Sequence, residues 1–214
     1  MKALLDNDVL IKASCYALAR ELADAIPGKE RCGVLGAAKY VVPQAIRRLS
    51  LNGGSAKPLQ VLTDFLKQQE VIEPTTDEQK LATSLETSAQ RLALSLDAGE
   101  SQLAAILILR GAPYLVTGDK RAITALEQLI DIDQQCAALT GKVFCLEQVV
   151  LKLIVCVSVA AVRSAICSEP AVDKTMSICF GCYSSEVASS SVTAGLQSYV
   201  NDLKSGARRA LAPT

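Results

Sequence analysis

The sequence predicts a three-layer α/β/α fold, in which a mainly parallel sheet of four or five strands lies between helices. Short apolar runs alternate with stretches of helical periodicity through about residue 150. Two of these runs are followed at once by an acidic residue and then by a helix. Strands that alternate with helices pair mainly in parallel, because each helix carries the chain back across the sheet.

The first elements are read from apolar spacing and from turn residues. Residues 2–6 predict a buried strand, and residues 8–25 predict a helix that ends before Pro27-Gly28. Residues 33–42 are apolar and fit either a strand or a helix. The next expected elements are a short helix that opens at Pro43, a loop at 52–55, a helix at 58–69 and a strand at 70–73.

The second half of the sheet domain follows the same alternation. Residues 77–96 and 99–110 predict two helices, and Gly111 ends the second one. The remaining expected elements are a strand at 113–117, a helix at 120–130, a strand at 142–146 and an apolar helix that begins at Glu147. Residues 1–150 are therefore expected to form the sheet domain, and residues 151–214 a helical extension partly packed on it.

The most apolar stretch, residues 149–166, is expected to be a buried helix. Lys152 and Arg163 leave only residues 153–162 free of charge, whereas a membrane helix needs roughly 20 apolar residues. We expect this helix to pack on the sheet domain or across a homodimer, with both basic side chains pointing outward. Beyond residue 167 the pattern weakens, and we expect less order, one helix at 186–204 and a frayed tail.

Composition removes several kinds of chemistry. The chain has no histidine, so it holds no Ser-His-Asp or Cys-His arrangement and no imidazole metal ligand. It has no tryptophan and only 3 phenylalanines, which argues against a large aromatic platform for base stacking. Lys and Arg number 22, as do Asp and Glu, so any surface that attracts nucleic acid must be local.

Cysteine usage bears on the compartment. Asp6 and Asp8 interrupt the first apolar run, so we do not expect this run to be a signal peptide. We expect a cytoplasmic protein whose 8 cysteines are mostly free thiols. Cys179 and Cys182 form a CxxC pair, and an alternative is that they bind zinc together with Cys156 and Cys167.

Acidic residues are expected to gather at one edge of the sheet. Asp6 closes the first strand and Asp119 follows the strand at 113–117, so both fall at the carboxyl ends of parallel strands. Asp8 lies at the mouth of the same site, and Asp97 and Glu100 open a helix. Carboxylates gathered without histidine favour a hard divalent cation such as Mg²⁺. Helix capping is the alternative explanation for Asp8, Asp97 with Glu100, and Asp119.

Three motifs resemble those of PIN-domain proteins. The first is Leu4-Leu5-Asp6-Asn7-Asp8-Val9-Leu10-Ile11, the second is Asp97-Ala98-Gly99-Glu100-Ser101, and the third is Leu115-Val116-Thr117-Gly118-Asp119. Their order and approximate spacing also match that family, over roughly residues 1–150.

The resemblance implies a Mg²⁺- or Mn²⁺-dependent endoribonuclease, either the toxin of a toxin–antitoxin pair or an RNA-processing enzyme. It implies that Asp6, Glu100 and Asp119 are catalytic metal ligands, that Asp8 or Asp97 assists them, and that Thr117 supports the site. The basic residues expected to hold the RNA backbone are Lys12, Arg47, Arg48, Lys120 and Arg121.

One departure from the family leaves alternatives open. The family has a further acid near residues 41–46, but no acid occurs between Glu30 and Asp64, and Gln44 is the candidate substitute. The first alternative is a PIN-like binding module with a weakened site. The second is a phosphatase similar to haloacid dehalogenases, suggested by Asp6 and Asp8; Leu10 stands where that family has Thr or Val.

Overall fold

The computed structural model describes residues 1–213 and has a five-stranded parallel sheet with the strand order β3-β2-β1-β4-β5. Leu5 of the central strand pairs with Val34 on one side and with Val116 on the other. The strands are β1 (Leu4–Leu5), β2 (Gly33–Leu35), β3 (Glu70–Ile72), β4 (Leu115–Thr117) and β5 (Val143–Cys145). The predicted parallel sheet is confirmed.

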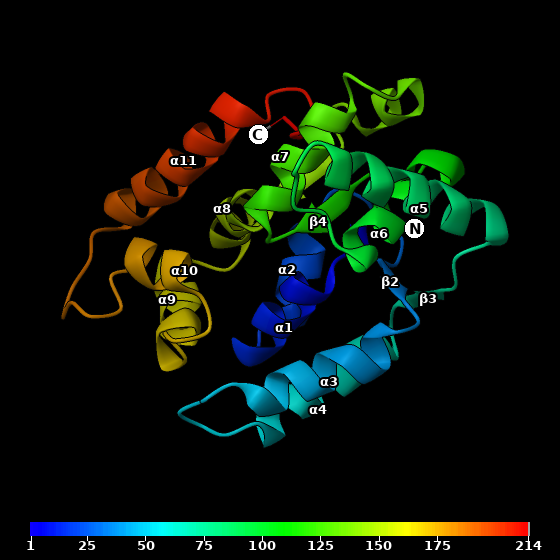
Figure 1. Ribbon diagram of the computed structural model, residues 1–214. Coiled ribbons are helices and arrows are strands. Elements are labelled where there is room, and N and C mark those ends of the chain that lie inside the picture. Colours follow the sequence, from blue (N-terminus) through cyan, green and yellow to red (C-terminus); the bar gives the residue numbers. More distant parts are fainter. Residues whose placement is uncertain (214) are drawn as a thin grey trace.

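Helices connect all the strands and cover both faces of the sheet (Figure 1). Those before β4 are α1 (Asn7–Cys15), α2 (Ala19–Ala25), α3 (Ala38–Arg48), α4 (Ala56–Leu66), α5 (Thr76–Arg91) and α6 (Ala98–Arg110). Those after β4 are α7 (Lys120–Leu129), the 3-10 helix η1 (Gln134–Leu139), α8 (Leu146–Cys156), α9 (Val159–Ser168), α10 (Lys174–Cys179) and α11 (Ser189–Gly206).

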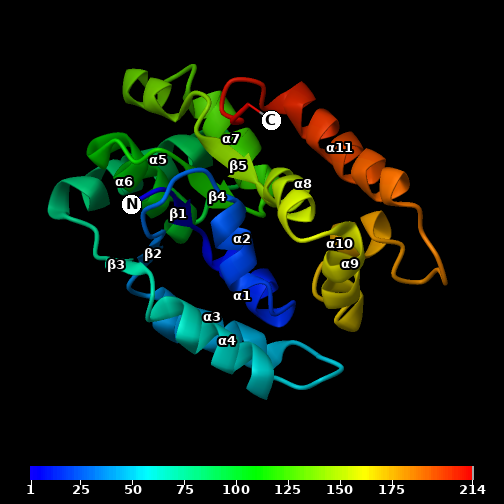
Figure 2. The same cartoon turned by 180° about the vertical axis from the view of Figure 1, so that it is seen from behind.

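Successive strand residues feed two separate cores, because side chains alternate between the faces of a sheet. Leu5 and Val116 enter the core that α1–α4 and α8–α10 cover. Leu4 and Leu115 enter the core that α5, α6, α7 and η1 cover. Figure 2 shows α1 and α2 on one side of the sheet, with the α3–α4 pair beyond them. The three-layer α/β/α architecture is therefore confirmed.

Two expected boundaries differ in the first half. The helix expected over residues 8–25 is two helices, and Ala17 between them has a positive φ of 54°. The ambiguous residues 33–42 contain β2 and then the start of α3, so Pro43 lies inside that helix instead of opening it. Apolar periodicity alone did not distinguish these arrangements.

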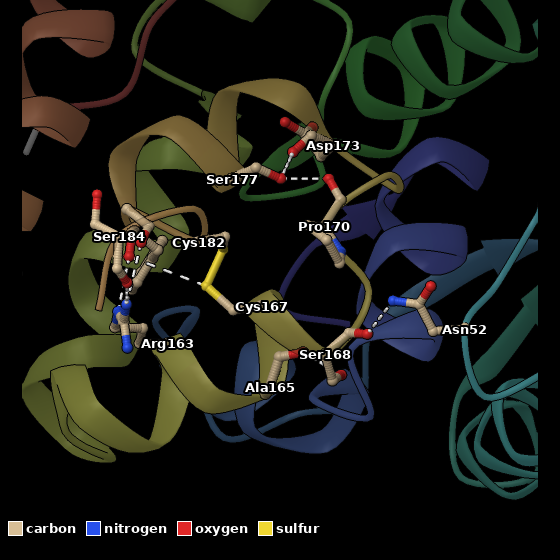
Figure 3. Close-up of a disulfide and its surroundings, with 12 residues drawn as sticks. Asn52, Arg163, Ala165, Cys167, Ser168, Pro170, Asp173, Ser177, Cys182 and Ser184 are labelled. Atoms are coloured by element: carbon tan, nitrogen blue, oxygen red, sulfur yellow. Dashed lines mark hydrogen bonds between the residues drawn. A yellow bond between two sulfur atoms is a disulfide. The ribbon is translucent and has the colours of Figure 1, made fainter. Parts of the chain in front are cut away.

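The apolar stretch at 149–166 is also broken. Val157 ends α8, and Ser158, with φ 131°, caps the first turn of α9 through its side chain. Arg163 does not point outward as expected: it donates hydrogen bonds to the carbonyl oxygens of Phe180, Gly181 and Ser184 at 2.9, 3.0 and 2.7 Å (Figure 3). The guanidinium thereby fixes the turn that follows α10.

The tail is not frayed. Ala210, Leu211 and Ala212 are buried, and Leu211 forms a parallel bridge with Val143 of β5. Arg209 pairs with Glu127 at 2.8 Å, which anchors the tail to α7. Helix α11 lies beside α8 (Figure 1) and buries Val192, Leu196 and Val200, so the region beyond residue 167 has more apolar anchors than expected. Within residues 1–213, no helix is both long and apolar enough to cross a membrane.

The zinc alternative is wrong as stated. Cys182 is bonded to Cys167 in a disulfide, so neither sulfur is available as a thiolate ligand (Figure 3). Cys179 is a buried free thiol, and Cys156 is exposed. The remaining cysteines are free, as expected for most of them.

Candidate functional site

A cleft of about 720 Å³ opens at the carboxyl edge of the sheet, around the ends of β1 and β4. It receives residues from β1–α1, from the start of α6, from β4–α7 and from the C-terminal segment. The sequence-predicted residues that line it are Asp6, Asp8, Lys12, Asp97, Glu100, Asp119, Lys120 and Arg121. Asp6 and Asp119 therefore face one cleft, as the carboxyl-edge rule predicts.

Asp6 is held by the two elements that meet at this edge. Its Oδ1 accepts a hydrogen bond of 2.7 Å from the Asn7 N–H, so Asp6, and not Asp8, caps α1. Its Oδ2 accepts one of 3.1 Å from the Thr117 hydroxyl, and Thr117 Oγ1 accepts one of 3.1 Å from the Asp119 N–H. Thr117 thus links Asp6 to the backbone of Asp119, which matches its expected supporting role.

Asp97 and Glu100 form a capping box at the start of α6. Asp97 Oδ1 accepts from the Glu100 N–H at 2.8 Å, and Glu100 Oε2 accepts from the Asp97 N–H at 2.9 Å. This helix start places Glu100 in the cleft as a buried side chain, while Asp97 is exposed at its rim. The capping role and a place in the cleft are therefore compatible.

Burial makes two of these carboxyl groups unusually easy to protonate. Desolvation raises the pKa of Asp6 to about 6, against the hydrogen bonds from Thr117 and Asn7. Desolvation also raises the pKa of Glu100 to about 8, and the nearby charges of Asp97, Asp6 and Asp119 add to the effect. Within residues 1–213, neither carboxyl group has a lysine or arginine at ion-pair distance. They form a buried acidic pair that would be stabilised by a cation.

Asp119 has a different environment. Its Oδ1 accepts hydrogen bonds from the backbone N–H groups of Arg121 and Ala122, so Asp119 caps α7. Burial acts to raise its pKa, but these bonds and the Arg121 guanidinium, 2.8 Å from Oδ2, lower it overall. Asp119 is therefore the ionised member of the group, already paired with an exposed arginine.

Two residues beyond β5 line the cleft without any local signal that would have selected them. Glu147 and Asp173 both line the cleft. Glu147 pairs with Lys120 at 2.9 Å, and the Lys120 ammonium also lies 4.2 Å from the Tyr199 ring centroid. No local motif marks Glu147 or Asp173, because each reaches the cleft through the packing of helices that are distant in sequence.

Three predicted residues lie elsewhere. Gln44, Arg47 and Arg48 are exposed on α3 and do not line the cleft. Gln44 therefore does not replace the acid that the PIN family has on this helix. The two arginines can contact RNA only if it extends beyond the cleft.

The carboxylates line the same cleft but do not lie close enough to one another to form a metal-binding cluster among residues 1–213. Among residues 1–213, no three Asp, Glu, Cys or His side chains stand close enough together to hold a metal ion in their present rotamers. The donor set itself fits Mg²⁺ or Mn²⁺, since it consists of carboxylate oxygens from several elements around one cleft.

Comparison with known proteins does not assign a family to the chain. No protein-family model matches it, and no significant match was found among curated proteins.

Proposed function

We propose that this protein is a Mg²⁺- or Mn²⁺-dependent endoribonuclease of the PIN-like type. One observation carries the proposal: Asp6, Glu100 and Asp119 come from three separate segments and line one cleft at the carboxyl edge of a parallel sheet. Two of these acids, Asp6 and Glu100, are buried without a cationic partner among residues 1–213. Burying a carboxylate in this way lowers the stability of the folded state unless a cation binds it.

Asp6, Glu100 and Asp119 would hold the cation, assisted by Asp8 or Asp97. Raised pKa values at Asp6 and Glu100 fit this role, because a bound cation offsets the cost of keeping buried carboxylates ionised. When bound, the cation supplies charge stabilisation at a phosphodiester and lowers the pKa of a water molecule.

The chain's own residues orient this chemistry. Thr117 donates to Asp6 and so fixes the carboxylate at the end of β1. Lys120 is held in place by Glu147, and Arg121, whose side chain is 76% exposed, stands at the rim. Both can neutralise backbone phosphates of RNA that lies along the cleft.

Cleavage of single-stranded RNA by the purified full chain tests the proposal. We expect cleavage with Mg²⁺ or Mn²⁺ and none with a chelator. Asp6→Asn should abolish it, because the change removes a ligand charge while keeping the side-chain volume. Asp77→Asn is the matched control, since Asp77 is an acid on the exposed surface of α5 with an 82% exposed side chain.

If Asp6→Asn cleaves RNA as fast as the parent, the activity belongs to a contaminant and the proposal fails. A parent that binds RNA but never cleaves it supports the second candidate, a non-catalytic PIN-like binding module. The position of Gln44 outside the cleft favours that candidate, because Gln44 supplies no ligand there in place of the missing acid.

An antitoxin partner, a homodimer and a cytoplasmic location belong to the same proposal. The dimer is tested by light scattering of the purified chain. The toxin role, which an antitoxin would counter, is tested by asking whether expression of the parent, but not of Asp6→Asn, arrests growth of a bacterial host.

A further inference from the structure

Lys12 occupies a bridging position at the mouth of the cleft. It follows Asp8 by one turn of α1, and its Nζ lies 2.7 Å from Asp8 Oδ2. The same Nζ lies 2.7 Å from Asp173 Oδ2, which belongs to the segment before α10. The Lys12 side chain is only 15% exposed, so its charge is less screened by solvent than that of a surface lysine.

Gly118 allows the Asp8–Lys12 pair to approach the end of β4. A Cβ atom at position 118 would collide with Asp8 Oδ2 and would lie 3.1 Å from Lys12 Nζ. Because Gly118 stands between Thr117 and Asp119, the Lys12 ammonium sits directly against the strand end that carries two proposed site residues.

Asp173 is held in place independently of Lys12. Its Oδ1 accepts a hydrogen bond of 2.9 Å from the Met176 N–H and so caps α10. Earlier in the same segment, Glu169 accepts hydrogen bonds of 2.7 and 2.8 Å from the N–H groups of Asn52 and Gly53. The Cys167–Cys182 disulfide closes the segment on the other side (Figure 3). Asp173 therefore meets Lys12 as a preorganised carboxylate.

The other cations of the cleft are less suited to act at its centre. Lys120 is occupied by Glu147 and lies over the Tyr199 ring. Arg121 is largely exposed and makes two side-chain hydrogen bonds to Asp119. Lys12 is the most enclosed cation of the cleft, with a 15% exposed side chain against 33% for Lys120, and the fourth cation, Lys174, is exposed.

We propose that Lys12 is the cation that contacts the reacting phosphodiester, and that Asp173 is a positioning residue that aims it. An ammonium group has three donors. Asp8 and Asp173 each place a carboxylate oxygen 2.7 Å from Nζ, and no third carboxylate lies within ion-pair distance of it among residues 1–213. At least one N–H therefore remains for a phosphate oxygen. This inference rests on the proposed nuclease function and extends it to the C-terminal segment.

The test compares single and double variants of the full chain. Lys12→Met should lower kcat by about 100-fold, as expected for loss of a donor to the transition state. It should not weaken Mn²⁺ binding measured by calorimetry, whereas Asp6→Asn should. Lys12→Arg should recover part of the rate. Asp173→Asn should lower kcat by roughly 10-fold, as for loss of a supporting partner.

Coupling and a matched control separate positioning from folding. If Asp173 acts through Lys12, the double variant should be no slower than Lys12→Met alone. Asp77→Asn, on the exposed surface of α5, touches neither Lys12 nor Asp173 and should leave kcat unchanged. A normal kcat in Lys12→Met, or additive losses in the double variant, would overturn the inference.

Binding of single-stranded RNA in the presence of a chelator, where no cleavage is expected, supplies a readout that does not need turnover. If the parent binds RNA but never cleaves it, weaker binding by Lys12→Met and normal binding by Asp77→Asn still support Lys12. Equal binding by all three proteins overturns it. A parent that neither binds nor cleaves RNA overturns the proposed function and this inference together, whereas an active parent with an active Lys12→Met overturns the inference alone.

Discussion

Replacing Asp6 by asparagine should stabilise the metal-free protein while it removes the proposed activity. Burial raises the pKa of Asp6 from 3.8 to about 6, so Asp6 ionises more easily in the unfolded state than in the folded state. Above pH 6 the folded state carries this buried carboxylate, which lowers its stability. The difference of about 2 pKa units corresponds to about 3 kcal/mol. Asparagine keeps an acceptor for the Asn7 N–H and carries no charge, so it should recover part of that free energy.

The sign of the pH dependence follows from linkage. Because the folded-state pKa is raised, protonated Asp6 favours the folded state at low pH. This contribution is complete below about pH 4 and is lost as the pH rises through about 6. The advantage of Asp6→Asn should therefore be largest at pH 7 or above and should disappear near pH 4.

Urea unfolding in the presence of a chelator measures the effect. At pH about 7.5 we expect Asp6→Asn to raise the free energy of unfolding by about 1 to 3 kcal/mol, and Asp77→Asn to change it by less than about 0.5 kcal/mol. Added Mn²⁺ should stabilise the parent and not the Asp6→Asn variant. Loss of stability in the metal-free Asp6→Asn protein would refute the reasoning, because it would show that ionised Asp6 is favourable without a cation.

Three further predictions concern residues around the site and the core. Glu78 is buried against Arg110, which lowers the pKa of Glu78 to about 2. Glu78→Gln should therefore lower the free energy of unfolding by about 2 kcal/mol at neutral pH. Urea unfolding should show this loss shrinking as the pH falls from about 4.5 toward 2. Arg209→Met should cost about 3 kcal/mol, measured by the same method, because it leaves the buried Glu127 carboxylate without its ion pair; an unchanged stability would show that this ion pair does not stabilise the fold. Gly118→Ala should lower RNA cleavage at least 10-fold, because its Cβ atom collides with the Asp8 carboxylate and displaces it. An active variant would contradict this prediction, and its crystal structure would show how the clash is avoided.

Local chemistry in the sequence was enough for the framework of the fold. Alternating apolar runs and helical periodicity identified β1, β3, β4 and β5 and the parallel sheet that they form. The Asp97–Glu100 capping box marked the start of α6, and Gly111, in the left-handed conformation, marked its end. These signals are readable because each one involves residues a few positions apart.

The convergence of Asp6 and Asp119 was also predictable from the sequence. Both follow strands, and the carboxyl ends of parallel strands share one edge. The position of Glu100 was not settled in that way, because the start of a helix can lie at either edge. Packing of α6 against the sheet decided that Glu100 lines the same cleft.

Only the tertiary structure decided what the C-terminal segment does. Asp173 reaches Lys12 across 161 positions (173 − 12), and Arg209 reaches Glu127 across 82. Neither contact has a local signature, because its partners are brought together by the packing of α10 and the tail against the sheet domain. The sequence by itself determined the sheet, its acidic edge and the boundaries of α6 and α7 through short-range propensity and capping. Long-range packing decided the two ion pairs, the ordered tail and the place of Asp173 in the cleft. Short-range sequence patterns do not encode such packing.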